Sequence, residues 1–334
     1  MKYYNLLKLN NWIKNPRFKL FGLYFLHLFK RRYLGVHFDP VNACNLRCKM
    51  CYFTDENYLK KLKGIFRKDD LHYFGKAILK RAIKLQIGCG TEPTLYKDLD
   101  AIIKLGKNYQ VPYISMTTNA NNIKLEKLRI WCELGLNEIT VSLHGVNKKT
   151  YEEMMGRGNF DRFLESLEHI TKIKQEFPKF QLRVNYTFNE DNFDQLAQFW
   201  DIFGNIKIDT LQIRPIKNMG NTAYQNFSMN SIIPKYQGLY QNLLLECEKR
   251  NTILIAPKLH QLKHKLSINS IIQNFTYCYI SPTTFWKEGF DWKNETFDEY
   301  SKRTKWAKHI LKQALGSKED LLKLKNESLN YELN

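Results

Sequence analysis

The sequence predicts an α/β fold in which a parallel sheet forms an open or partial barrel. The chain has 334 residues, 43% of them hydrophobic, and this is enough to bury a large core. From Tyr33 onward, short β-branched or aromatic runs alternate with longer charged amphipathic segments, a pattern typical of βαβ units. Six such units in about 180 residues fall short of the eight of a closed barrel. The prediction is therefore a partial (β/α)6 barrel.

The elements of this barrel follow one another in a regular order. Strands are expected at 33–39, 84–88, 113–118, 138–143, 181–188 and 210–215. Helices are expected between them at 69–83, 97–109, 123–134, 147–175 and 191–203. In parallel α/β sheets, functional residues gather where the strands end at the carboxyl edge, so candidate residues are sought there.

The pattern loosens after residue 218. A helix at 232–249, a strand at 252–256 and a Tyr/Trp-rich hairpin at 278–292 with its turn at Gly289 are expected there. This divides the chain into a basic amphipathic segment at 1–34, a core domain at 35–218 and a smaller α+β extension at 219–334.

The first 34 residues are basic and aromatic around an apolar stretch at 18–29, FKLFGLYFLHLF. This stretch is too short for the ~20 residues of a spanning helix, and no small-residue cleavage site follows it. Its composition suits an interfacial helix on an anionic membrane. The alternative, which is favoured, is a helix packed on the protein's own surface.

The chain is strongly basic, with 52 Lys and Arg against 33 Asp and Glu and a formal net charge of +19. Such a charge attracts RNA, anionic lipid or acidic substrates. Lys and Asn are frequent throughout the chain, which indicates a general bias in composition rather than a surface built for one ligand. Nucleic-acid binding is therefore not favoured. Seven cysteines without the spacing of a secreted disulfide framework indicate a reducing compartment. The predicted location is the cytoplasm, with peripheral contact at the inner membrane face as an alternative.

Three cysteines, Cys44, Cys48 and Cys51, follow the first predicted strand with the spacing CxxxCxxC. Structural zinc sites usually close with four ligands in two separated pairs, and the sequence offers no second pair. Three thiolates leave one metal position open, and in an iron–sulfur cluster the open iron can bind a substrate or cofactor. The triplet therefore predicts a metal centre with a functional open position.

The segment CNLRCKMC resembles the signature of the radical S-adenosylmethionine (radical SAM) superfamily. GTEP at 90–93 is similar to the family's GGEP element, with Thr91 in place of the second glycine. TTNA at 117–120 resembles its TNG turn, and VSLHG at 141–145 resembles VSLDG. Further similar stretches are GRGNF (156–160), RVNYTFNEDN (183–192) and QIRPIKN (212–218). The resemblance covers residues 35 to 218 in the family's order.

This resemblance implies a radical SAM partial barrel with two cofactors, one [4Fe–4S] cluster on the three cysteines and S-adenosyl-L-methionine (SAM). In the family, an electron from the cluster cleaves SAM and leaves a 5′-deoxyadenosyl radical that abstracts hydrogen from a substrate. An acidic side chain suits the methionyl ammonium and a hydroxyl or cationic group suits its carboxylate. The implied cofactor-binding residues are Gly90, Thr91, Glu92 and Pro93 around the ammonium, Ser142 and Arg157 at the carboxylate, Asn119 and Asn185 at the ribose, and Met50 or Tyr52 near the adenine.

His144 and Arg214 are the candidate catalytic residues at the edge where a substrate would enter. His144 replaces the carboxylate of the family's motif, so it is expected to pair with an anionic group or to act as acid or base.

The C-terminal third resembles the first half of the SPASM extension that carries auxiliary clusters in peptide-modifying relatives. It offers only Cys247 and Cys278, and Trp292 stands near the place expected for a further ligand. Two thiols cannot hold a four-iron cluster alone, so a degenerate extension and a single cluster are expected. Cys89 and Cys132 are expected to be buried apolar residues.

Three functions remain open. The first is a radical SAM enzyme that acts on an unidentified peptide, sugar or small metabolite and receives electrons from a donor such as flavodoxin or ferredoxin. The second is an RNA-modifying radical SAM enzyme, although no appended RNA-binding module is recognisable. The third is a non-catalytic, zinc-stabilised basic protein on a membrane surface.

Overall fold

The computed structural model describes residues 12–13, 15–217, 221–259, 262 and 272–317. Within them, one sheet of nine strands dominates the fold. Its strands are β1 (Leu34–Phe38), β3 (Ala82–Ile87), β4 (Tyr113–Thr118), β5 (Glu138–Leu143), β7 (Gln181–Phe188), β8 (Thr210–Pro215), β9 (Ile253–Ile255), β10 (Tyr277–Ser281) and β11 (Thr284–Phe285).

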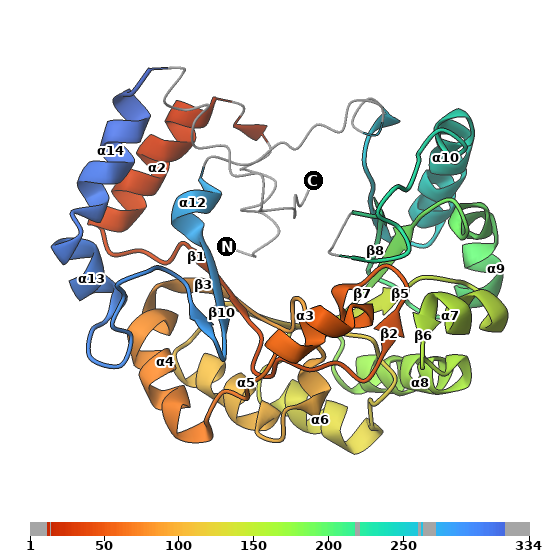
Figure 1. Ribbon diagram of the computed structural model, residues 1–334, viewed down its shortest axis with the longest axis horizontal. Coiled ribbons are helices and arrows are strands. Elements are labelled where there is room, and N and C mark those ends of the chain that lie inside the picture. Colours follow the sequence, from red (N-terminus) through yellow and green to blue (C-terminus); the bar gives the residue numbers. More distant parts are fainter. Residues whose placement is uncertain (1–11, 14, 218–220, 260–261, 263–271, 318–334) are drawn as a thin grey trace.

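These strands lie in the order β11-β10-β1-β3-β4-β5-β7-β8-β9. Every neighbouring pair is parallel except β10 with β11, which is antiparallel. The two edges, β11 and β9, do not pair, so the described sheet curves into an open barrel rather than a closed one (Figure 1). The predicted partial barrel is confirmed.

Most of the helices lie outside this curved sheet, whereas α3 lies near β2 (Arg47–Cys48) in front of it (Figure 1). The helices are α2 (Pro16–Leu28), α3 (Glu56–Lys61), α4 (Leu71–Ile78), α5 (Leu99–Asn108), α6 (Leu125–Glu133), α7 (Lys148–Met154), α8 (Phe160–Glu176), α9 (Phe199–Phe203), α10 (Ile233–Lys249), α12 (Gln273–Thr276), α13 (Phe297–Arg303) and α14 (Trp306–Leu315).

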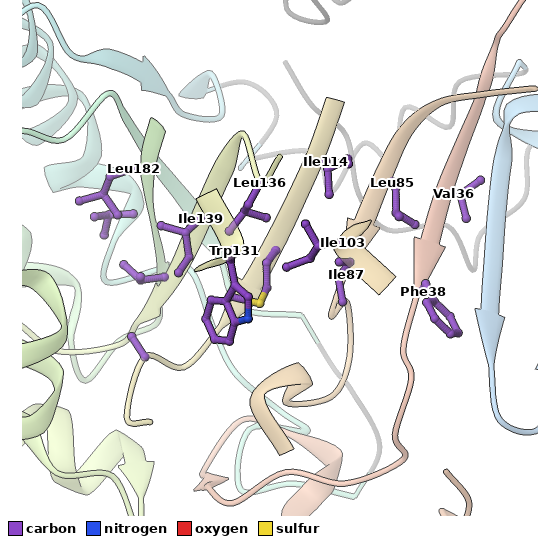
Figure 2. Close-up of a cluster of buried hydrophobic side chains, with 14 of the residues drawn as sticks. Val36, Phe38, Leu85, Ile87, Ile103, Ile114, Trp131, Leu136, Ile139 and Leu182 are labelled. Atoms are coloured by element: carbon purple, nitrogen blue, oxygen red, sulfur yellow. The ribbon is translucent and has the colours of Figure 1, made fainter. Parts of the chain in front are cut away.

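The core fills the space between the outer face of the sheet and these helices. Alternate residues of each strand point outward, as strand geometry requires. Val36 and Phe38 of β1 and Leu85 of β3 lie in the same buried cluster as Ile103 of α5 and Trp131 of α6 (Figure 2). The opposite residues of each strand face the inside of the barrel.

The predicted helix over 147–175 is wrong as one continuous element. Helix α7 ends at Met154, a short strand β6 (Met155–Gly156) follows, and α8 begins at Phe160 with the Asn159 side chain capping its amide ends. Arg157 has a φ of 66°, which a helix cannot contain. The break serves the cysteine loop, because β6 pairs with β2 (Arg47–Cys48).

The C-terminal part extends both edges of the barrel sheet. β9 pairs with β8, and β10 pairs in parallel with β1, so the sheet continues across the predicted boundary at residue 218. The hairpin turn lies between Ser281 and Thr284. The expected turn at Gly289 is therefore wrong; Gly289, with a φ of 71°, lies in the loop that follows β11.

Helix α2 lies in the basic N-terminal segment. The Asn15 side chain caps it, Pro16 begins it, and Leu20 and Leu23 are buried against the core. No helix in the described part of the chain is long and apolar enough to cross a membrane. The predictions made for residues 1–11 and for the C-terminal end at 318–334 fall outside the described residues.

Candidate cluster and cofactor site

Polar side chains line the inside of the barrel because they alternate with core residues along each strand. Val184 and Tyr186 of β7 are buried in the core, so Asn185 between them faces inward. Its register partners are Ser142 of β5 and Gln212 of β8. Ser142 and Asn185, both predicted as cofactor residues, therefore lie side by side on the inner face.

Ionisable groups lie deeper on the same face. Arg183 is 3.4 Å from the Glu138 carboxylate and donates to Gln212 at 3.3 Å, and Tyr113 donates to Glu138 at 2.9 Å. Burial lowers the pKa of Lys84 to about 8, and nearby Glu138 opposes that shift. The inner surface is therefore charged and extensively hydrogen-bonded.

The three cysteines lie in the loop that follows β1, and each is half-buried. The loop is held by the β2–β6 pairing, in which Arg47 is opposite Gly156 and Cys48 is opposite Met155. A Cβ on Gly156 would stand 2.6 Å from the Arg47 carbonyl oxygen, so this close approach requires glycine.

The thiols influence one another electrostatically. Burial raises the pKa of Cys48, and the neighbouring Cys51 and Cys44 raise it further. Burial and the Glu92 charge raise the pKa of Cys44 to about 12. Bound metal would supply the positive charge that makes such thiols bind as thiolates.

The glycine-rich loop after β3 is anchored by a carboxylate that the sequence did not reveal. Asp39, buried at the end of β1, accepts hydrogen bonds from the amides of Cys89 at 2.6 Å and Gly90 at 3.1 Å and from the Thr91 hydroxyl at 3.1 Å. Tyr279 of β10 donates to the same carboxylate at 2.9 Å. Because Asp39 precedes the cysteine motif and Tyr279 lies 240 residues away, only the folded chain reveals this contact.

Glu92 is buried and joins the glycine-rich loop to the end of β4. Its Oε1 accepts from the Thr118 hydroxyl at 2.7 Å and from the hydroxyl and amide of Thr94, and its Oε2 accepts from the Asn119 amide at 2.8 Å. Oε1 accepts three hydrogen bonds and Oε2 accepts one, so Oε2 can accept a further hydrogen bond more easily than Oε1 can. Pro93 begins the short 3₁₀ turn that follows.

Asn119 connects this loop to the cysteines. Its side-chain amide donates to Asn45 at 2.8 Å and lies 3.9 Å from the Cys44 sulfur. Ala120, where the family has glycine, is fully buried with a φ of 58°, in the left-handed region that glycine adopts most easily.

The remaining predicted cofactor residues surround the loops. The Tyr52 hydroxyl donates to the Gly90 carbonyl, which places it on the glycine-rich loop. Met50 is buried in a small apolar cluster with Met154, Ile216 and Tyr224. Arg157 is exposed at the tip of the β6 turn.

His144 and Arg214 come together at the carboxyl edge. Arg214 donates to the Thr187 hydroxyl at 3.2 Å. Burial lowers the pKa of His144 to about 4, and the Arg214 charge lowers it in the same direction. A neutral imidazole beside a guanidinium suits hydrogen bonding more than pairing with an anion.

Comparisons with known proteins agree with this arrangement. Residues 39–199 match the model of the Radical SAM superfamily. This part of the chain is therefore a radical SAM domain.

Curated relatives match the same part of the chain. A protein of Saccharolobus solfataricus named "Probable GTP 3′,8-cyclase" is 28% identical over 192 residues, which cover 55% of this chain and 58% of the relative. A protein of the same name from Sulfolobus acidocaldarius is 26% identical over 196 residues. The chain thus spans somewhat more than half of the length of these relatives.

Solved structures share the fold. Streptococcus suis SuiB bound to S-adenosylmethionine aligns with a TM-score of 0.59 and 18% identity over 81% of this chain and 64% of SuiB. The enzyme anSMEcpe with bound AdoMet and a peptide aligns with a TM-score of 0.59 and 17% identity over 86% of this chain and 84% of that one.

The radical SAM superfamily uses a [4Fe–4S] cluster and SAM, and the described residues fit both. Two buried polar atoms, Oδ1 of Asn185 and Nδ1 of His144, have no hydrogen-bond partner among the described residues, as expected where a polar ligand binds. No three His, Cys, Asp or Glu side chains in the described part converge on a single metal ion. The thiols of a cluster bind different iron atoms, so they need not converge in this way.

The C-terminal cysteines lie in the core. Cys247 of α10 and Cys278 of β10 are both buried, and Cys278 is opposite Val36 in the sheet. Trp292 stacks on Phe285 with ring centroids 4.4 Å apart. Cys132 is buried as expected, whereas Cys89 is only half-buried and its sulfur lies 3.5 Å from Nδ1 of His37.

Proposed function

We propose that this chain is a radical SAM enzyme that holds one [4Fe–4S] cluster on Cys44, Cys48 and Cys51 and binds SAM beside it. When bound, the cluster and SAM would supply reductive cleavage of SAM and, through it, hydrogen abstraction from a substrate. A one-electron donor of the flavodoxin or ferredoxin type would reduce the cluster.

The observation that carries this proposal is the connection through Asn119. Its backbone amide donates to Glu92 and its side chain reaches Asn45 and Cys44. One residue thereby sets the distance between the cysteine loop and the glycine-rich loop. A cluster and a cofactor that chelates it need these two loops at a fixed separation.

The proposed roles follow from position. Oε2 of Glu92 and the Gly90 and Thr91 backbone would receive the methionyl ammonium, and Ser142 would hydrogen-bond its carboxylate. Asn185, with its unpartnered Oδ1, would accept from the ribose. Tyr52 lies on the glycine-rich loop and Met50 lies in a separate apolar cluster, and either would be the adenine neighbour. Arg157 is exposed at the tip of the β6 turn, so Ser142 on the inner face is the better placed of the two carboxylate candidates.

The substrate would be polar. Glu138, Arg183 and Gln212 place charged and hydrogen-bonding groups on the inner face, and a polar substrate suits such a surface better than an apolar one. The printed names of the compared proteins point to different ligands, GTP for the cyclases and a bound peptide for anSMEcpe. We therefore keep the substrate class at a peptide, a sugar or a small metabolite, with His144 and Arg214 at its entry.

The test is anaerobic reconstitution with iron and sulfide, followed by iron counting and detection of 5′-deoxyadenosine after addition of SAM and dithionite. About four irons per chain are expected. The variant Cys44→Ala/Cys48→Ala/Cys51→Ala should lose iron and product. Cys132→Ala is the matched control, since it removes a buried thiol of α6 outside the site and should keep both.

Other outcomes would replace the proposal. Bound zinc with no SAM cleavage would favour the zinc-stabilised binding protein. Cleavage together with RNA that stays bound at raised salt would favour an RNA-modifying enzyme.

A further inference from the structure

Helix α2 presents an exposed apolar stripe on the side that faces away from the core. Leu20 and Leu23 are buried, whereas Phe18, Phe25 and Phe29 are 67%, 52% and 70% exposed. Spacings of seven and four residues place these three rings on one helix face. Leu26, 41% exposed, widens the stripe, and the Phe25 and Phe29 rings stack with centroids 6.4 Å apart.

The stripe gathers several exposed apolar side chains on one helix rather than a single one. Single exposed hydrophobic residues are normal, but contiguous patches mark interaction sites. From residue 20 to residue 26 the helix carries no charged side chain at all. The stripe therefore lacks the charged residues that usually keep an exposed helix face in water.

The surface beside the C-terminal end of α2 is rich in cations. A groove of about 550 Å³ lies between the end of α2 and the helices α13 and α14. Leu28 of the helix lines this groove together with two acidic residues, Asp298 and Glu299. The cations that line it are Lys30, Arg81, Lys302, Lys305 and Lys308.

The acidic residues of the groove do not neutralise it. Arg81 is buried and pairs with Asp298 at 2.8 Å, which satisfies that carboxylate. Glu299 accepts from the Thr296 hydroxyl and amide in the capping box of α13. Four lysines therefore face one capping carboxylate, and the groove attracts anions.

We infer that the face formed by α2 and α14 binds the surface of an anionic lipid bilayer. The three phenylalanines would enter the interface between headgroups and acyl chains, and Lys30, Lys305 and Lys308 would contact lipid phosphates. Aromatic residues beside lysines are the composition of interfacial helices that lie in the membrane plane.

The position of this face suits such contact. Figure 1 shows α2 and α14 side by side at one outer edge of the barrel, away from β2, β6 and α3 near the cysteine loop. A bilayer bound there would leave the candidate site accessible. The high positive charge of the chain favours an anionic surface over an acidic peptide because a bilayer accepts the apolar stripe and the lysines together.

The test is sedimentation of the full chain with extruded vesicles. Phosphatidylcholine vesicles are compared with vesicles that contain about one third phosphatidylglycerol. Phe25→Ser/Phe29→Ser removes part of the stripe, and Lys305→Glu/Lys308→Glu reverses the groove charge. Ile202→Ser/Leu245→Ser is the matched control, because these residues are 47% and 54% exposed on other helices. Circular dichroism melts verify that all variants fold.

The wild type should bind the anionic vesicles, bind them less as salt is raised, and bind neutral vesicles weakly. Both the stripe variant and the charge variant should bind at least tenfold more weakly, while the control binds as the wild type does. Absence of wild-type binding, or a stripe variant that binds normally, would overturn the inference. So would a dimer, detected by light scattering, that the stripe variant dissociates. SAM cleavage in solution should be the same in all four proteins, so this result is independent of the proposed enzymatic function.

Discussion

The Tyr279 hydroxyl donates a 2.9 Å hydrogen bond to Asp39, the carboxylate that also accepts from the amides of Cys89 and Gly90. A strand from the C-terminal part of the chain thereby orients the acceptor that fixes the glycine-rich loop. The C-terminal part is thus structurally coupled to the proposed cofactor site.

Tyr279→Phe should weaken SAM binding without changing the fold. It removes one hydrogen bond to a buried carboxylate, worth about 1–3 kcal/mol, and loosens the loop that Asp39 holds. The dissociation constant for SAM should rise roughly threefold to tenfold, with iron content unchanged. Amide hydrogen exchange at Cys89 and Gly90 should be faster even without cofactor.

The matched control is Tyr236→Phe, in which a buried tyrosine of α10 loses its 2.5 Å bond to the Pro257 carbonyl. It should lower thermal stability to a similar degree but leave SAM binding and loop exchange unchanged. If both variants affect SAM binding equally, the role of Tyr279 is only general stability.

Ala120→Gly should be nearly neutral for stability. The left-handed backbone at Ala120 costs a non-glycine residue about 1–2 kcal/mol. Glycine removes that cost but adds about 0.5–1 kcal/mol of backbone entropy and loses a methyl worth about 0.8 kcal/mol. The free energy of unfolding should therefore change by less than about 1 kcal/mol.

Ala77→Gly provides the comparison, because Ala77 is equally buried but lies in helix α4. The free energy of unfolding of this variant should fall by roughly 2 kcal/mol, which is the sum of the lost helix propensity and the lost burial of a methyl group. Equal losses in the two variants, measured by urea denaturation, would show that Ala120 carries no strain.

Gly156→Ala should impair cluster binding. The added Cβ would stand 2.6 Å from the Arg47 carbonyl oxygen, a backbone atom that can move only if the β2–β6 pairing opens. Iron retained after reconstitution should fall by more than half. Gly238→Ala, where nothing lies within 4 Å of the added Cβ, should bind iron normally and gain a little helix stability. Normal iron content in Gly156→Ala would show that the cysteine loop does not need the pairing with β6 to bind the cluster.

His144 should make the protein less stable as the pH falls. Its folded pKa of about 4 lies below the ordinary value of 6.5, so the unfolded chain binds this proton first. The contribution of a neutral His144 to the free energy of unfolding is fully present above about pH 6.5 and is lost as the pH falls towards 4. At pH 5.5 about 1.4 kcal/mol of it has been lost. His144→Gln should reduce the difference in unfolding free energy between pH 7.5 and 5.5 by about that amount. An unchanged difference would mean that His144 does not titrate in this range.

Local patterns in the sequence were sufficient for the barrel strands and for the residues that follow them. The alternation of strand and helix patterns placed the six barrel strands, and the cysteine motif placed three thiols after β1. These features depend only on neighbouring residues. The face of β7 that carries Asn185 was not predicted, and it follows from the burial of Val184 and Tyr186 in the core. The assignments of individual residues to the ammonium, carboxylate, ribose and adenine stay predictions.

Features that depend on distant pairing could not be predicted. β10 pairs with β1 across more than 200 residues, so neither the strand's place in the sheet nor the Asp39–Tyr279 bond is visible in the sequence. The break between α7 and α8 exists because Gly156 packs against Arg47, a contact with the cysteine loop. Helical periodicity on both sides of the break concealed it.

The most direct test of the central claim is the electron paramagnetic resonance spectrum of the dithionite-reduced, reconstituted protein before and after addition of SAM. A site with three cysteines and one open iron should give a [4Fe–4S]⁺ signal that changes on adding SAM, because SAM would bind at the open position. A reduced-cluster signal that SAM leaves unchanged, or no cluster signal at all, would contradict the account.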